Sequence, residues 1–250
     1  MSFEISKKHP RYSSLRYRHK LIDGLKEGYV TEAGLIAHGR GEAFDYLLGE
    51  RTVSYAYEAE RAAVALLLLA EHPVISVNGN VAALVSREIV KLAKLIPASL
   101  EINLFYWTRE REVLIEKVLK KAGAEKVFGT NAQQKIELPG IASHRAWVDK
   151  MGIAKADVCM VALEDGDRTE ALKSIGKKVI AIDLNPLSRT AQNADISICD
   201  NIVRAVPNMI NMVKEMKEWD KNMLKKLVKD FDNRKNLESS LLLIRKGVLV

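Results

Sequence analysis

Cysteine and aromatic residues are scarce in this 250-residue chain, and no long apolar run occurs in it. Its two cysteines, Cys159 and Cys199, lie within apolar stretches, so they fit neither a disulfide framework nor the ligand spacing of a metal site. The longest purely apolar run, residues 62–70, is about half of a membrane span. The N-terminus has no apolar core followed by a cleavage site. We therefore expect a cytoplasmic protein that does not span a membrane.

Basic residues outnumber acidic ones, 39 to 32, which gives a formal net charge of +7 and indicates anionic partners. Much of the excess lies at the two ends, in residues 7–26 and 214–245. Nucleic-acid binding would better suit basic patches interleaved with aromatic side chains, and aromatic residues make up only 6% of the chain. We expect no nucleic-acid partner, and we interpret the C-terminal basic stretch as a solvated helix face.

Six short apolar segments, mostly without polar alternation, follow one another from residue 73. They are PVISV (73–77), SLEINLFYW (99–107), KVFG (126–129), DVCMVAL (157–163), KKVIAIDL (177–184) and ADISIC (194–199). Helical or loop segments separate them. This order predicts an α/β fold with a Rossmann-like, mostly parallel sheet of about six strands, buried on both faces and flanked by helices.

The remaining residues read mainly as helix. We expect a single α/β domain over residues 1–250, with a helical N-terminal extension (1–72), the sheet core (73–200) and C-terminal helices (201–250). Within it, a helix begins at Pro10, and the pair Gly39 and Gly41 divides its segment into two short helices.

Other helix boundaries rest on capping residues. Gly28 suits a helix end, and residues 55–72 read as a buried helix. Thr108 and Ser143 suit N-caps, the latter of a helix over residues 144–151, and Ser188 suits a third helix start.

Polar residues follow four of the predicted strands. The segments are 78–80, 164–168, 183–190 and 200–202. Ligands of open parallel sheets bind at the carboxyl ends of the strands, where helix N-termini offer N–H groups to anions. The four segments therefore predict one shared site. The usual nucleotide fingerprints are absent, because the G-x-G around Arg40 follows a helix and lacks a third small residue.

Arginines are the strongest indication of phosphate binding, since a guanidinium can hold two oxygens at once. Arg40 lies between two glycines, which allow a ligand close to the backbone. Arg168 and Arg189 follow predicted strands, although nearby carboxylates could simply be the salt partners of Arg168. Arg18 lies on an amphipathic helix, where the residue pattern alone favours a solvated charge.

Two further positions have open interpretations. Asp183 could accept hydrogen bonds from ribose, hold Mg²⁺ through water, or form a turn before Pro186. His144 and Arg145 could lie in a first helical turn near an anion, and His38 precedes the Gly-Arg-Gly segment; a lone histidine is more often structural than catalytic.

Six motifs in one order resemble the archaeal phosphopantothenate synthetases, also called 4-phosphopantoate–β-alanine ligases. They are residues 9–12 (HPRY), 37–42 (AHGRGE), 78–80 (NGN), 142–145 (ASHR), 163–168 (LEDGDR) and 183–191 (DLNPLSRTA). The resemblance runs from about residue 9 through the C-terminal helices, and the last two motifs are long enough to be specific.

The resemblance implies a homodimeric enzyme of coenzyme A biosynthesis that needs Mg²⁺. ATP, 4-phosphopantoate and β-alanine would give 4′-phosphopantothenate, AMP and diphosphate, by way of an acyl adenylate. Motif by motif, it implies nucleotide contacts at Arg18, Arg40, Asp183, Leu184, Asn185, Arg189, Thr190, Asn201 and Ile202.

From these contacts we assign roles. Asp183 and Asn185 would bind ribose or the base edge. Arg189, Thr190 and the N–H groups near Asn201 would bind the phosphates, and Arg40 would neutralise charge on the α-phosphate or the leaving diphosphate.

The roles that remain concern the other substrates. His144, Arg145 or Arg168 would hold the substrate phosphate or a carboxylate. The base for β-alanine would be Asp165, Asp167 or His144. The ligands of Mg²⁺ are not assigned.

Two alternatives stay open at this point. The same scaffold could carry another nucleotide-dependent carboxylate–amine ligase, because a fold does not determine its substrate. The chain could also be a nucleotide-sensing or RNA-binding regulator, which the basic ends favour and the few aromatic residues oppose.

Overall fold

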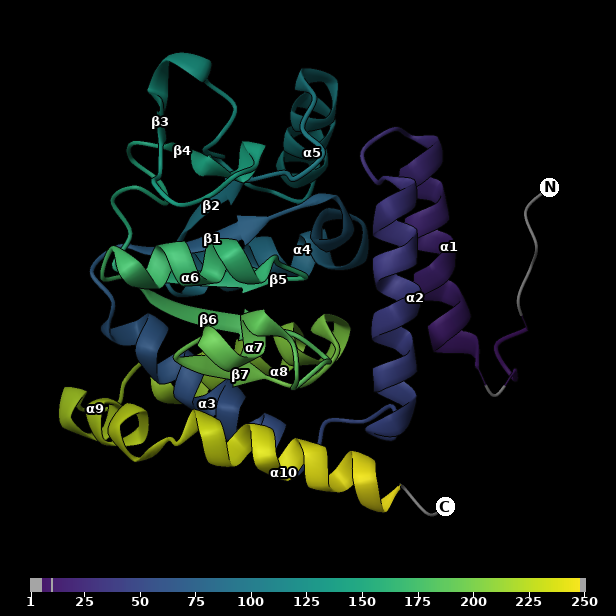
Figure 1. The fold of residues 1–250 in the computed structure, drawn as a ribbon, viewed down its shortest axis with the longest axis vertical. Helices are drawn as coiled ribbons and strands as arrows, with labels where there is room; N and C mark the ends of the chain where they lie inside the picture. The colour runs from purple at the N-terminus through teal and green to yellow at the C-terminus, as the bar shows by residue number, and fades with distance from the viewer. Residues whose placement is uncertain (1–5, 10, 248–250) are drawn as a thin grey trace.

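A computed structural model describes residues 6–9 and 11–247. At its centre lies a five-stranded parallel sheet with helices on both faces (Figure 1), in the strand order β2-β1-β5-β6-β7. Its strands are β1 (Pro73–Val77), β2 (Ser99–Ile102), β5 (Val158–Ala162), β6 (Lys178–Ile182) and β7 (Ile196–Ile198). The Rossmann-like α/β fold expected from the sequence is confirmed, and the division into an extension, core and tail stays a prediction.

Strand residues alternate between two apolar cores, which is why the segments read as continuous apolar runs. Ile75, Met160 and Ile180 face the larger core, which the helices α1, α3, α4, α5 and α8 complete. Val74, Cys159 and Val179 face a smaller core against α6. Burial raises the pKa of the Cys159 thiol to about 12, so this cysteine is a packing residue.

The helices surround this sheet. They are α1 (Tyr12–Lys26), α2 (Glu32–Leu47), α3 (Ser54–Leu69), α4 (Gly79–Leu95), α5 (Arg109–Lys121), α6 (Gly166–Ser174), α7 (Arg189–Asn193), α8 (Ile202–Met216), α9 (Lys221–Asp230) and α10 (Asn233–Lys246), with short 3-10 turns at Ala132–Gln134 and His144–Ala146. In Figure 1, α1 and α2 stand side by side beyond the ends of the strands. No helix of the described residues is long and apolar enough to cross a bilayer.

One strand prediction and one helix prediction need correction. The segment 126–129 adds no sixth strand, because its pairing with β2 is a single bridge, Glu101 to Phe128, before the chain turns at Gly129 with φ +86°. A two-stranded antiparallel sheet, β3 (Lys135–Glu137) with β4 (Trp147–Asp149), occupies part of the region predicted as a helix over residues 144–151.

Glu101 explains why that helix does not form. Its carboxylate is buried and accepts hydrogen bonds from the backbone N–H groups of Asp149 (3.0 Å) and Ile153 (2.6 Å). Ser143 makes no capping hydrogen bond. A buried carboxylate 48 residues away in the sequence therefore fixes this backbone, and no local pattern could reveal it.

Helix α2 is continuous through Gly39 and Gly41, so the prediction of two short helices is wrong. The buried carboxylates of the helix, Glu42 and Asp45, form ion pairs with α1 and α8, and these contacts offset the weak helix propensity of glycine. Thr108 and Ser188 cap α5 and α7 as predicted, and α1 ends just before Gly28, whose φ is +88°. Pro10 lies outside the described residues.

Candidate functional site

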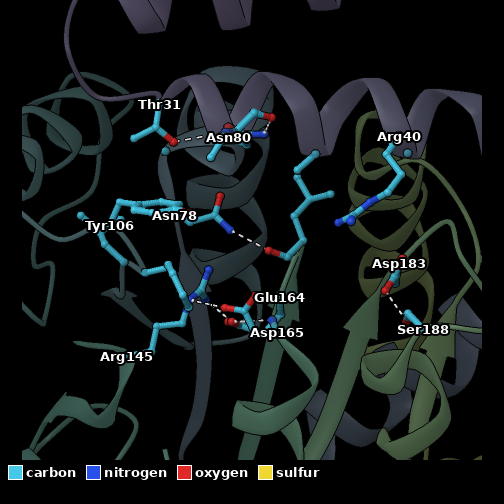
Figure 2. A pocket seen from close by; sticks show the side chains of 18 of the residues that line it. Thr31, Arg40, Asn78, Asn80, Tyr106, Arg145, Glu164, Asp165, Asp183 and Ser188 are labelled. Atoms are coloured by element: carbon cyan, nitrogen blue, oxygen red, sulfur yellow. Dashed lines mark hydrogen bonds and ion pairs between the residues drawn. The ribbon is translucent and has the colours of Figure 1, made fainter. Parts of the chain in front are cut away.

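A cavity of about 470 Å³ opens at the carboxyl ends of the central strands, with α2 as its roof (Figure 2). The turn from β1 into α4, the loop after β2 and the segments after β5 and β6 complete its wall. The lining includes Thr31, Gly34, Arg40, Gly41, Asn78, Gly79, Asn80, Tyr106, Arg111, Arg145, Leu163, Glu164, Asp165, Asp183, Leu184, Asn185 and Ser188. Polar side chains thus converge where the topology of a parallel sheet places its ligands.

Asp183 forms one end of the cavity together with Arg40. The Asp183 carboxylate accepts hydrogen bonds from the Asn185 N–H (2.9 Å) and from the Ser188 hydroxyl, so it shapes the turn after β6. Burial raises the pKa of Asp183, and the Arg40 charge opposes that shift. Arg40 is exposed and makes no ion pair with any described residue, which leaves its guanidinium available to an anion.

Glu164 joins two buried arginines below the other end. Its side chain is 1% exposed, and it accepts hydrogen bonds from both Arg145 and Arg168. Arg168 is wholly enclosed and also donates to Ser76 (3.1 Å), so it supports the cavity floor instead of lining it. The Arg145 Nε lies 3.0 Å from Asp165 Oδ2.

Asn78 and Asn80 fix the α4 end of the cavity. Asn78 caps α4 by accepting from the Val81 N–H (3.0 Å) and donates to the Ala162 carbonyl (2.9 Å). The Asn80 amide donates to the carbonyl of Gly34 (2.8 Å) and so ties the roof helix to α4.

The predicted site residues divide into three groups. Arg40, Arg145, Asp165, Asp183, Leu184 and Asn185 line the cavity. Asn201 and Ile202 line a smaller hollow next to it, which shares Gly41, Leu163 and Leu184 with the cavity. Those that line neither are Arg18, His144, Asp167, Arg168, Arg189 and Thr190.

Three residues of the third group already have partners, as Arg168 does. Arg18 pairs with Glu42 (2.7 Å), and the exposed Arg189 pairs with Glu170 (2.8 Å). Thr190 is buried, and its hydroxyl donates to the Glu164 carbonyl (2.9 Å).

His144 stacks on the Trp107 ring, with centroids 4.2 Å apart, and burial lowers its pKa. His38 lines the smaller hollow, where burial also lowers its pKa.

Sequence reasoning did not single out Tyr106 and Arg111 as site residues. Both follow β2, Tyr106 in the loop and Arg111 in the first turn of α5. The charged segment REREV reads as an ordinary solvated helix start, so nothing in it indicates a ligand. The segment Asn78-Gly79-Asn80, by contrast, could be predicted as part of the site, because it is polar and directly follows a predicted strand.

A buried acidic residue, Glu60, lies behind the smaller hollow. Its side chain is inaccessible to solvent; Oε1 accepts from Asn208 (3.4 Å), whereas Oε2 has no hydrogen-bond partner among the described residues. Burial, followed by the charge of Asp200, raises the pKa of Glu60 from 4.5 to about 9. Glu60 is therefore protonated at neutral pH in the folded protein.

This shift predicts that stability falls as pH rises from about 4.5 to about 9, because only the unfolded chain releases the proton there. The contribution of Glu60 to the free energy of unfolding is fully present below pH 4.5. Within that window it falls by up to about 1.4 kcal/mol per pH unit. Glu60→Gln, which keeps a donor, should become increasingly more stable than wild type between pH 6 and 8.5 in urea unfolding. Parallel pH profiles for the two proteins would contradict this.

The fold and the cavity define an α/β protein of Rossmann-like architecture with an arginine-lined ligand site at the ends of its strands. The model of the phosphopantothenate/pantothenate synthetase family matches residues 55–247. The chain belongs to this family.

Three relatives are named 4-phosphopantoate–β-alanine ligase. That of Thermococcus kodakarensis is 57% identical over 96% of this chain and 92% of its own length. That of Methanosarcina mazei is 52% identical, covering 95% and 93%, and that of Methanospirillum hungatei 45%, covering 98% of each. The resemblance drawn from the six motifs is confirmed.

Proposed function

We propose that this protein is an ATP-dependent ligase that condenses 4-phosphopantoate with β-alanine, giving 4′-phosphopantothenate, AMP and diphosphate. The relatives carry the name of this activity over nearly the whole chain. In the molecule, the cavity lined by Arg40, Arg111 and Arg145 supports this proposal. The reactants of the ligation carry a triphosphate, a phosphomonoester and two carboxylates, and guanidinium groups bind such anions.

The reaction divides into two displacements. The pantoate carboxylate attacks the α-phosphorus of ATP, the bond to diphosphate breaks, and an acyl adenylate forms. The β-alanine amine then attacks the acyl carbon, loses a proton and expels AMP. Such steps need positioning and charge neutralisation more than a protein nucleophile.

The cavity end near Asp183 suits the nucleotide. Asp183 and Asn185 would hold the ribose or the base edge, and Arg40 would neutralise charge on the α-phosphate or on the diphosphate. Among the predicted nucleotide contacts, Arg18, Arg189 and Thr190 would act only after their present partners are exchanged, whereas Asn201 and Ile202 lie at the adjoining hollow.

Mg²⁺ fits this site as an ion carried by the nucleotide. The described residues contain no group of three or more His, Cys, Asp or Glu side chains that could enclose a metal. Mg²⁺ commonly binds through one or two carboxylates together with phosphate oxygens and water. Asp165 lines the cavity with a side chain that is 43% exposed, and its Oδ2 faces the Arg145 Nε at 3.0 Å, so Oδ1 is the oxygen that could meet the ion. The ion would withdraw charge from the triphosphate.

The alternative role of Asp165 is that of the base for β-alanine, because a carboxylate that binds Mg²⁺ is a poor proton acceptor. His144 and Asp167 do not line the cavity, whereas Asp165 does. Burial raises the Asp165 pKa above its usual range, and this makes the carboxylate a better proton acceptor.

A homodimer is part of the same proposal. The roof helix α2 exposes large apolar side chains, with Ile36 73% and Leu47 47% exposed, as an association surface would. Light scattering of the purified protein gives the mass, and a monomer at working concentration would contradict this part alone.

Diphosphate release tests the function. Purified protein with ATP and Mg²⁺ should release diphosphate in step with AMP and phosphopantothenate only when both 4-phosphopantoate and β-alanine are present. If turnover occurs only when another acid replaces 4-phosphopantoate or another amine replaces β-alanine, the protein is a different carboxylate–amine ligase. No turnover, together with salt-dependent RNA binding, would favour the regulator.

A further inference from the structure

Arg111 stands out in the cavity wall because, in the part of the chain that the structure describes, no carboxylate forms an ion pair with it. Its Nη2 donates to the Tyr29 carbonyl (3.1 Å) and its Nη1 to the Tyr106 carbonyl. Its Nε is buried and has no hydrogen-bond partner among residues 6–9 and 11–247. Neutral carbonyl oxygens thus hold a positive charge that lines the cavity, and no carboxylate of the described residues pairs with it.

A second arginine adds to this positive charge. Arg145 is 5% exposed and lines the same part of the cavity. Burial lowers the Arg111 pKa, and repulsion from Arg145 lowers it further, so the two guanidinium groups are close enough to interact. Glu164 and Asp165 compensate Arg145, and Glu164 is shared with Arg168.

The N-terminus of α4 completes the surroundings of Arg111. A Cβ placed on Gly79 would lie 3.2 Å from Arg111 Nη2, so the guanidinium packs against the first residue of the helix. The first N–H groups of a helix have no intrahelical acceptor and attract anions. Gly79 is required here, because the same Cβ would lie 2.2 Å from the Tyr29 carbonyl oxygen.

The two ends of the cavity therefore differ in chemistry. Figure 2 shows Arg40, Asp183 and Ser188 on one side of the cavity, and Asn80, Tyr106 and Arg145 on the other. The first side offers a carboxylate and a hydroxyl suited to a nucleoside. The second offers two guanidinium groups and a helix start, which suit a phosphomonoester.

We propose that Arg111, with Arg145 and the first turn of α4, binds the phosphate of 4-phosphopantoate and selects this substrate over unphosphorylated pantoate. This assignment rests on the proposed function. It orients the substrate with its phosphate away from ATP and its carboxylate towards the α-phosphate near Arg40. A site built to bind a charged group discriminates strongly against the analogue that lacks it.

Substrate discrimination in Arg111→Met tests the proposal. Binding of 4-phosphopantoate, pantoate and ATP to wild type and variant is measured by calorimetry and by thermal shift, and the Michaelis constants where turnover occurs. We expect the variant to bind 4-phosphopantoate about 100-fold or more weakly, while its affinities for pantoate and ATP change less than about threefold. Arg111→Lys, which keeps the charge but not the fork, should lose about tenfold.

Arg109→Met is the matched control. Arg109 lies in the same helical turn but pairs with Glu112 (3.1 Å) and does not line the cavity, so its replacement should leave all three affinities unchanged. Equal losses for 4-phosphopantoate and pantoate in both Arg111 variants would overturn the proposal and make Arg111 a structural prop for Tyr29 and Tyr106. Unchanged discrimination would place the phosphate elsewhere.

Measurements on the wild-type protein distinguish a failure of this proposal from a failure of the proposed ligase function. If wild type binds neither 4-phosphopantoate nor pantoate and releases no diphosphate with any combination of substrates, the ligase proposal fails. If wild type is an active ligase and Arg111→Met still prefers the phosphorylated substrate, only the Arg111 assignment fails.

Discussion

Arg40→Ala should abolish ligation and leave the protein folded. The Arg40 side chain is exposed on α2 and makes no ion pair with a described residue, so its removal costs the folded state little. Its loss would remove the cation that we propose to face the transferring phosphate, and groups of this kind are worth about 10²- to 10³-fold in rate. Diphosphate release at saturating substrates measures the effect, with circular dichroism and the Tm as the check on folding.

Arg87→Ala is the comparison for Arg40. Arg87 is exposed on α4 and lies outside the cavity, so its removal subtracts the same charge from the protein. We expect normal turnover in this variant. Normal turnover in Arg40→Ala as well would end the role assigned to that arginine.

Glu164→Ala should destabilise the protein by about 3–5 kcal/mol, because it leaves buried arginines without their shared carboxylate. The Glu164 side chain is 1% exposed, and that of Arg168 is fully buried. The Arg168 guanidinium could not turn towards water without opening the cavity floor. Urea unfolding of variant and wild type gives the difference in the free energy of unfolding.

Glu170→Ala provides the exposed counterpart. Glu170 accepts a two-pronged ion pair from Arg189 on α7, but both side chains are largely solvent-accessible. Exposed pairs contribute at most about 1 kcal/mol. If the two variants lose similar stability, burial does not distinguish the two clusters and the interpretation of Glu164 is wrong.

The sequence predicted the structure correctly wherever neighbouring residues alone determine it. Buried strands predicted the parallel sheet, and topology alone brought Asp165, Asp183 and Asn185 to one edge. Long-range contacts decided the rest. Glu101 converts a predicted helix into a strand, and the Thr190 hydroxyl turns inward to a carbonyl.

Arg111 shows the limit most clearly. Arg109 and Arg111 occupy one helical turn and look equivalent in the sequence, but only the first has a carboxylate partner. The difference arises from the Tyr29 carbonyl, 82 residues away in the sequence, which no pattern within the helix encodes.

The ties of the roof helix have a consequence for biosynthesis. Asp45 near the end of α2 accepts hydrogen bonds from Asn201, 156 residues later, and from Arg204, 159 residues later. At a translation rate of about 5–20 residues per second, this helix leaves the ribosome roughly 10–30 s before the residues that hold it. The contact from Asn80 forms earlier, but the C-terminal end of the roof helix stays unanchored until most of the chain has been made, so the nascent protein acquires its complete binding site only near the end of synthesis.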